Sequence, residues 1–249
     1  MNLPTSTTAE DLNLINNHVL PCLYGSKPFH PRRGPGILMG YTEVAYFEAV
    51  LSHLKPKCAI EVGTETGSTL AIIAKYSQQV VSIDIDPLVK TKLSSQFSNV
   101  IFLTGSSHAL LPAALGKIAE QEVPVDFIFI DGDHSADGVR RDVEAVLAYR
   151  PKTKLVVMMH DSFNPDCRKG MLAANWAGSP YCHFVEMDFA AGVLHPDAPW
   201  RGHMWGGLGF ALFLPEPRTH ELRVMASQQL LYEAALAQSV YLSEKLLNL

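Results

Sequence analysis

Cysteine is scarce in this chain, which has four cysteines among its 249 residues. They are widely spaced, no two form a CxxC pair, and they stand at Cys22, Cys58, Cys167 and Cys182. This pattern gives no support to a disulfide framework. Residues 1–10 are polar and have neither the basic start nor the apolar stretch of a secretion signal. We therefore expect free thiols in a cytoplasmic protein.

Dense basic runs and long apolar runs are also missing. The net charge is −5 and no Lys/Arg run stands out, so the sequence does not support a nucleic-acid partner. No apolar run reaches the ~18 residues of a membrane span, so no membrane partner is expected. The hydrophobic content of 47% over 249 residues is enough for one sizeable core with appended helices.

Apolar runs alternate with helical patterns through the middle of the chain. Strands are expected at 58–62, 80–84, 100–104, 125–131 and 154–159, and at 182–187 and 207–214. Helices are expected at 8–23, 42–54, 67–77, 87–97, 107–120, 136–148, 166–176 and 219–249. Near-continuous apolar strands that alternate with helices are typical of a parallel sheet covered on both faces. We therefore predict an α/β fold with a doubly wound, mostly parallel, seven-stranded Rossmann-like sheet.

A glycine-containing turn follows the first of these strands. Residues 61–69 read EVGTETGST, with Gly63 and Gly67 four apart. Such a turn lets backbone N–H groups approach a ligand at a helix N-terminus, where the dipole favours a carboxylate or phosphate. The next strand ends in Asp84, an acid placed to hold two ribose hydroxyls. The pair predicts a nucleoside-binding protein.

The same turn lacks two features that phosphate ligands require. Glu65 stands where a dinucleotide fingerprint has its second glycine, and a carboxylate there would repel a pyrophosphate. The glycine spacing is one residue short for a P-loop, and no Lys precedes Ser68 and Thr69. A ligand with a ribose but no phosphate, such as S-adenosylmethionine (SAM), fits better. A nicotinamide-dependent oxidoreductase is the alternative on this type of sheet, and Glu65 argues against it.

Acids and histidines gather at the predicted carboxyl ends of two later strands, where open α/β sheets bind ligands. One strand is followed by Asp131, Asp133 and His134, and another by His160 and Asp161. Asp131 and Asp161 could share one Mg²⁺, which prefers oxygen ligands. A metal that holds a hydroxyl lowers its pKa, and a nearby histidine can accept the proton. Structural roles, such as Asp131 or Asp133 capping the next helix, stay open.

The segment at 129–135, FIDGDHS, is followed by Gly138, Val139 and Asp142. With the acid-x-Gly-x-x-x-Gly turn it resembles class I SAM-dependent methyltransferases over residues 36–214. The resemblance is to small-molecule O-methyltransferases related to macrolide-sugar methyltransferases and cephalosporin-type tailoring enzymes. More distantly, the chain is similar to catechol and caffeoyl-CoA O-methyltransferases. The resemblance implies an antiparallel strand near the C-terminus. It also implies a domain at 41–215, between an N-terminal helix and lid at 1–40 and a C-terminal helix at 216–249.

The resemblance also implies roles for individual residues. Around SAM it places Glu61, Gly63, Thr64, Gly67, Thr69, Asp84, Ser106, Ser107, His108 and Asp131, with residues 36–39 closing over the cofactor. It places Mg²⁺ between Asp131 and Asp161, with His134 as the general base. Relatives have other residues where this chain has His160 and Ser162. His160, Ser162 and a water thus remain open as the third ligand, and Mn²⁺, Fe²⁺ or Zn²⁺ remains open as the ion.

The sequence therefore predicts a SAM-dependent, divalent-metal-dependent O-methyltransferase that acts on a small hydroxylated molecule such as a natural product, sugar or phenol. Candidate walls of the acceptor pocket are Trp200, His203 and Trp205, together with His30, Arg32 and Arg33. The two arginines could equally belong to a solvated loop. A non-catalytic SAM-binding protein is a further alternative. The terminal segments are compatible with a homo-oligomer.

Overall fold

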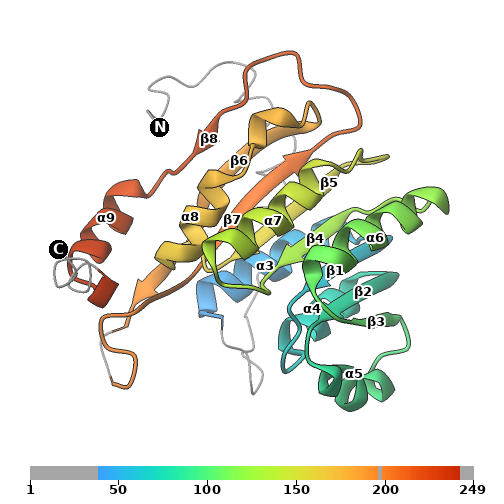
Figure 1. The fold of residues 1–249 in the computed structure, drawn as a ribbon, viewed down its shortest axis with the longest axis horizontal. Helices are drawn as coiled ribbons and strands as arrows, with labels where there is room; N and C mark the ends of the chain where they lie inside the picture. Colours follow the sequence, from blue (N-terminus) through green and yellow to red (C-terminus); the bar gives the residue numbers. More distant parts are fainter. Residues whose placement is uncertain (1–38, 196–197, 242–249) are drawn as a thin grey trace.

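One eight-stranded sheet forms the centre of the computed structural model, which describes residues 39–195 and 198–241 (Figure 1). The strand order is β3-β2-β1-β4-β5-β7-β6-β8. Neighbouring strands are parallel except at β7, which is antiparallel to both β5 and β6. The predicted doubly wound, mostly parallel sheet with an antiparallel strand near the C-terminus is confirmed.

The elements have the following bounds. The strands are β1 Cys58–Val62, β2 Gln79–Asp84, β3 Val100–Thr104, β4 Phe127–Ile130, β5 Leu155–His160, β6 Cys182–Leu194, β7 Met204–Phe213 and β8 Val224–Met225. The helices are α3 Tyr41–Leu54, α4 Ser68–Tyr76, α5 Pro87–Leu93, α6 Ser107–Glu120, α7 Ala136–Leu147, α8 Pro165–Ala173 and α9 Gln229–Ala237. Two short 3-10 turns, η2 Ser94–Gln96 and η3 Trp176–Gly178, complete the list.

Two apolar clusters cover the two faces of the sheet. Ile60 of β1 and Ile128 of β4 belong to the cluster under α6, α7 and α8. Their chain neighbours Ala59 and Phe129 point to the other face and pack under α3, α4 and α5. Successive side chains of a strand alternate between faces, and all four of these are fully buried. Burial on both faces explains why the strands are near-continuous apolar runs.

The predicted strand count was wrong, because the sheet has eight strands rather than seven. The extra strand is β8, which is only two residues long and pairs with β6. β6 itself runs to Leu194 instead of ending at residue 187. Its acids Glu186 and Asp188 look like the end of a strand in sequence, yet both are buried and accept hydrogen bonds.

The predicted helix over 219–249 was also too long. Within the described residues, α9 covers only Gln229–Ala237, and residues 219–228 contain no helix but include the short strand β8. The backbone N–H groups of Ser227 and Gln228 donate to Glu186 and Asp188 of β6. These bonds draw the segment along the sheet edge, so it cannot begin a helix earlier. The helix predicted at 8–23 lies outside the described residues.

The expectations of free thiols and of no membrane-spanning segment can be compared with the described part of the chain. Cys58, Cys167 and Cys182 are buried free thiols, as predicted, while Cys22 falls outside that part. None of the helices described there has the combined length and apolarity needed to cross a bilayer.

Candidate active site

The turn between β1 and α4 depends on two glycines with positive φ. Gly63 has φ 81°, and a Cβ at this position would collide with the carbonyl oxygen of Asp131. Gly67 has φ 79° at the N-cap of α4, and a Cβ there would lie 2.6 Å from Leu93 Cδ1. Only glycine adopts such backbone without strain. The turn thus lies directly against the end of β4.

Glu61 stabilises this turn through hydrogen bonds in the protein interior. Its side chain is fully buried, and its two oxygens accept hydrogen bonds from Thr69 Oγ1 and Thr64 Oγ1, each at 2.7 Å. Burial raises the pKa of Glu61 to about 8, although the two hydroxyls oppose the shift. The three predicted cofactor residues Glu61, Thr64 and Thr69 therefore form one buried hydrogen-bonded unit beneath the turn.

Asp84 stands beside the turn at the end of β2. Its Oδ2 accepts from the backbone N–H groups of Thr64 (2.8 Å) and Glu65 (2.9 Å), and its Oδ1 accepts from Asp86 N (2.8 Å). These bonds fix the carboxylate at the carboxyl edge of the sheet. The next residue, Ile85, is 76% exposed and offers an apolar surface there. Ribose binding by Asp84 remains a prediction.

Ser106, Ser107 and His108 begin α6 at the same edge of the sheet. Asp84 pairs with Thr104 in the β2–β3 register, so the start of α6 follows the strand next to β2. Ser106 is exposed, whereas the Ser107 hydroxyl donates to Asp142 Oδ2 of α7 at 3.1 Å. The position of these residues is compatible with the predicted contact to adenine, which stays a prediction.

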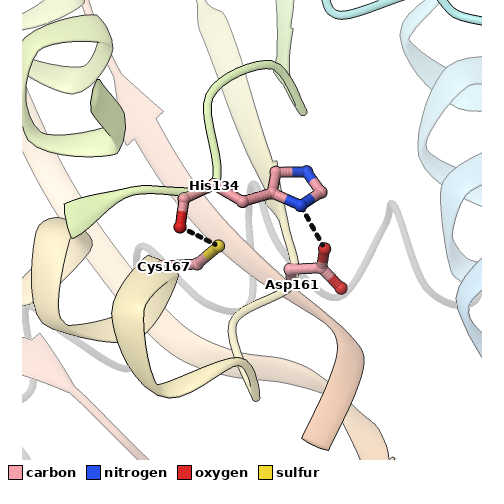
Figure 2. Close-up of side chains that lie close together, drawn as sticks. All are labelled: His134, Asp161 and Cys167. Carbon is pink, nitrogen blue, oxygen red and sulfur yellow. Dashed lines mark hydrogen bonds and ion pairs between the residues drawn. The ribbon is translucent and has the colours of Figure 1, made fainter. Parts of the chain in front are cut away.

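Asp131, His134, His160 and Asp161 come together where β4 and β5 end. His134 Nε2 lies 3.3 Å from Asp131 Oδ1, and His134 Nδ1 lies 3.5 Å from Asp161 Oδ2. Figure 2 shows the His134 ring facing the Asp161 carboxylate, while the thiol of Cys167 contacts the His134 carbonyl (3.5 Å). Asp161 has φ 58°, a left-handed conformation that is rare outside glycine, and its Oδ1 accepts from Gly206 N at 2.5 Å.

The charges in this cluster are strongly coupled. The hydrogen bond with Asp131 raises the pKa of His134, against the effect of burial. Burial disfavours a charged His160, yet the carboxylates around it raise the pKa of His160 well above its ordinary value. Burial also raises the pKa of Asp161. The carboxylates therefore create a local field that attracts positive charge.

Two groups of side chains have donor atoms within 4.8 Å of one another, as a metal ion requires. One is Asp131, His160 and Asp161, and the other is His134, Asp161 and Cys167. Burial raises the pKa of Cys167 far above its ordinary value, so its sulfur remains a thiol and a poor ligand. The first group contains two carboxylates and an imidazole, a set that suits a divalent ion, and the choice between His160 and Ser162 as third ligand stays a prediction.

Aromatic rings continue from this cluster toward the surface. The Trp205 ring centroid lies 5.9 Å from that of His134, and Trp200 packs edge-on against Trp205 at 6.3 Å. Trp200 also contacts His203, which in turn contacts Tyr241. Trp200 is 53% exposed. These residues form a wall beside His134, in the segment predicted to line an acceptor pocket.

Sequence reasoning missed Glu43 and the glycine pair Gly206–Gly207. Glu43 of α3 is buried, and its Oε1 lies 3.1 Å from His160 Nε2. Gly206 and Gly207 have φ 74° and 84° near the start of β7, where their N–H groups reach Asp161 and Glu43. Consecutive glycines at the start of an apolar strand indicate a close backbone approach, and this signal was present.

Comparisons with known proteins bear on the fold that carries these residues. Residues 60–162 match the model of a family described as a methyltransferase domain, which spans β1 to the end of β5. A search of curated proteins finds no match.

Several solved structures have the same fold. An O-methyltransferase from Bacillus cereus in complex with SAH is 15% identical, with a TM-score of 0.51 over 83% of this chain and 97% of that chain. Cofactor-bound Rv0187 from MTB is 14% identical, with a TM-score of 0.52 over 85% and 100%. The O-methyltransferase TomG from Streptomyces achromogenes, involved in tomaymycin synthesis and in complex with SAM, is 15% identical, with a TM-score of 0.50 over 72% and 83%. At these identities the likeness establishes the fold.

Proposed function

We propose that this chain, a class I methyltransferase by its fold and by its methyltransferase domain, is a SAM-dependent O-methyltransferase that uses a divalent metal ion and methylates a hydroxyl of a small molecule. The observation that carries the proposal is the cluster of Asp131, His134, His160 and Asp161 at the carboxyl edge, directly beside the glycine turn. The proposed base and the proposed metal ligands therefore lie next to the turn expected to hold the cofactor.

On the cofactor side, the chain offers the carboxylate of Asp84 and the backbone N–H groups at the start of α4. Asp84 is held in place by three backbone N–H groups, which leaves its carboxylate oriented for ribose hydroxyls. The N-cap of α4 at Gly67 has no side-chain partner, so its N–H groups can meet a carboxylate such as that of a methionine moiety. These features fit SAM better than a dinucleotide, because Glu65 would oppose a pyrophosphate.

On the acceptor side, Asp131, His160 and Asp161 would hold the ion, which orients a bound hydroxyl and lowers its pKa. His134 is the proposed base that takes the hydroxyl proton. Its side chain is 41% exposed, so a substrate can reach it. Each ring nitrogen also faces a carboxylate, which stabilises the imidazolium that forms on proton transfer.

The aromatic wall suggests the acceptor class. Trp205 and Trp200 present indole rings beside His134. Such rings favour stacking with a flat phenolic or a glycosidic acceptor. We therefore expect phenols, catechols and glycosylated natural products to be better acceptors than acyclic alcohols.

Calorimetric titration with SAM, first with Mg²⁺ and then with EDTA, tests the cofactor class, and NAD serves as the control ligand. We expect micromolar SAM binding and no NAD binding. Binding of NAD without SAM would overturn the proposal in favour of an oxidoreductase.

Substitution of the proposed base tests the chemistry. We expect His134→Ala to lower methyl transfer from labelled SAM about 10²- to 10⁴-fold, the usual contribution of a general base. SAM affinity should stay unchanged. Turnover near the wild-type level would show that another group removes the proton.

A further inference from the structure

We infer that the ion position next to His134 is a nitrogen-containing site that selects a transition-metal dication such as Mn²⁺, Fe²⁺ or Co²⁺ over Mg²⁺. We further infer that Glu43 is the positioning residue that makes His160 a ligand through Nδ1. Both inferences rest on the proposed metal dependence and go beyond it, since they name the class of ion and a residue outside its ligand set.

The hydrogen bonds of Glu43 define it as an acceptor. Its Oε2 accepts from Gly40 N at 2.6 Å, and its Oε1 accepts from Gly207 N at 2.7 Å. Backbone N–H groups can only donate, so both oxygens of Glu43 act as acceptors. The side chain is only 6% exposed, so water does not compete strongly for these oxygens.

The contact with Glu43 bears on the tautomer of His160. Glu43 Oε1 lies 3.1 Å from His160 Nε2 and already accepts from the backbone N–H of Gly207. We therefore assign the hydrogen of the contact to Nε2. In a neutral imidazole the lone pair is then on Nδ1.

That lone pair points at two other acceptors. His160 Nδ1 lies 3.2 Å from Asp131 Oδ1 and 3.6 Å from Asp161 Oδ1. Three such acceptors can share this space only when a cation lies between them, which is either a proton on Nδ1 or a metal ion that replaces this proton. Ligands at about 2.1 Å from an ion are separated by about 3.0 to 3.5 Å in octahedral or tetrahedral geometry. The observed separations are close to this range.

The chemistry of the ligand set then decides which ion is preferred. Mg²⁺ is bound through oxygen and keeps several waters, whereas imidazole suits first-row transition metals. A carboxylate on the far nitrogen of a ligating histidine orients the ring and raises its basicity. Glu43 occupies this position toward His160. The absence of a side chain at Gly206 permits this, since a Cβ there would lie 3.1 Å from Glu43 Oε1.

Metal titration of the full chain after EDTA treatment and dialysis tests the class of ion. We expect Mn²⁺ to bind at least tenfold more tightly than Mg²⁺ in calorimetry. Pulsed electron paramagnetic resonance of bound Mn²⁺ should show a directly coordinated nitrogen. His160→Asp should remove this nitrogen signal and reduce the difference between the Mn²⁺ and Mg²⁺ affinities. His134→Ala should retain the signal.

Glu43→Gln tests the positioning role. Since the charge that holds the Nε2 proton is lost, we expect Mn²⁺ affinity to fall about 10- to 100-fold, the usual effect of removing such a partner. The matched control is Glu48→Gln on the same helix, where Glu48 pairs with Lys75; it should leave Mn²⁺ affinity and the nitrogen signal unchanged. If Glu43→Gln fails to fold, Glu43→Asp, which draws the carboxylate back, must show the same loss.

The outcomes separate this inference from the proposed function. If Mg²⁺ binds as tightly as Mn²⁺ and no nitrogen signal appears, the nitrogen site is refuted, while a metal-dependent methyltransferase stands. If no ion binds although SAM does, both metal statements fall, and His160 is instead an imidazolium between Glu43 and Asp131. Equal affinities of the Glu43→Gln and Glu48→Gln variants would remove the role of Glu43 alone.

Discussion

At the scale of single residues, Gly63 decides whether the turn after β1 can close against the end of β4. Gly63 has a positive φ and lies against the backbone of Asp131, so any side chain here would both strain the local backbone and collide with Asp131. The carbonyl of Asp131 belongs to the strand end that delivers the proposed ligands. The turn proposed to hold the cofactor and the cluster proposed to hold the ion are thus in contact at this one glycine.

Gly63→Ala should therefore destabilise the protein by about 2 kcal/mol or more and abolish SAM binding, because the backbone must shift to admit the Cβ. The matched control is Gly116→Ala in α6, where a Cβ meets nothing within 4 Å. This control should gain about 0.5 to 1 kcal/mol from helix propensity. Urea denaturation gives both values, and equal effects at the two positions would refute the steric argument.

Glu61 makes the stability of the protein depend on pH. Its pKa is about 8 in the fold against an ordinary value of 4.5. Between these values the folded state keeps a proton that the unfolded chain has released, so stability falls as the pH rises through this window. The slope from this group is at most about 1.4 kcal/mol per pH unit.

Glu61→Gln removes this titration and should flatten the decline of stability between pH 5 and pH 8 relative to the wild type. Other groups titrate equally in both proteins, so the difference between the two profiles isolates Glu61. Urea midpoints at several pH values provide the measurement. Parallel profiles would mean that Glu61 is ionised in the fold.

The strand-end residues of the site could be predicted from the sequence, and Glu43 could not. Asp131 and Asp161 directly follow buried apolar strands, and the carboxyl ends of parallel strands meet at one edge. Glu43 lies on a helix, 117 residues from its partner His160. In the sequence nothing distinguishes it from Glu48, because helical periodicity does not say which face meets a distant loop.

At the scale of elements, a buried ion pair connects α8, β6 and α9. Arg168 Nη1 lies 2.7 Å from Asp188 Oδ1, with the two side chains 2% and 0% exposed. Arg168 also donates to Gln229 of α9 and lies 4.2 Å over the Tyr232 ring. A further bond from Arg168 reaches Ser162 O, next to Asp161. The pair thus links the C-terminal helix to the segment after β5.

Asp188→Asn should destabilise the protein by about 3 to 5 kcal/mol, because it leaves the buried guanidinium of Arg168 without its counter-charge. Lys75→Ala is the control, since it removes a pair with an exposed lysine and should cost less than about 1 kcal/mol. Chemical denaturation followed by circular dichroism measures both. A cost for Asp188→Asn as small as that of the control would show that the pair adds little.

The same ion pair explains where prediction of the elements failed. Glu186 and Asp188 are polar, so a strand that contains them looks finished at residue 187. Their partners lie on α8 and at residues 227–228, far away in sequence. The first five strands, β1 to β5, contain no such buried acids paired with distant partners in their interior, and their apolar runs predicted their bounds within a few residues.

At the scale of the whole molecule, the sheet and its helices enclose three thiols. Cys58, Cys167 and Cys182 are buried, and burial raises the pKa of Cys58 to about 11 and that of Cys182 to about 12. Thiolates are the reactive species, so these cysteines should be inert while the fold is intact.

Thiol labelling followed by mass spectrometry should therefore modify these three cysteines only in urea, with a midpoint that matches the loss of circular dichroism. A cooperative domain exposes its core in a single transition. Labelling of any of the three well below that midpoint would reveal local opening of the element that carries it.

The direction of β7 has a consequence for the geometry of the site. Because β7 is antiparallel to β5, its first residues lie beyond His160, at the edge where β5 ends. The backbone N–H groups of Gly206 and Gly207 donate there to the carboxyl groups of Asp161 and Glu43. One reversed strand thereby fixes two acidic side chains from different elements in a single orientation beside His160.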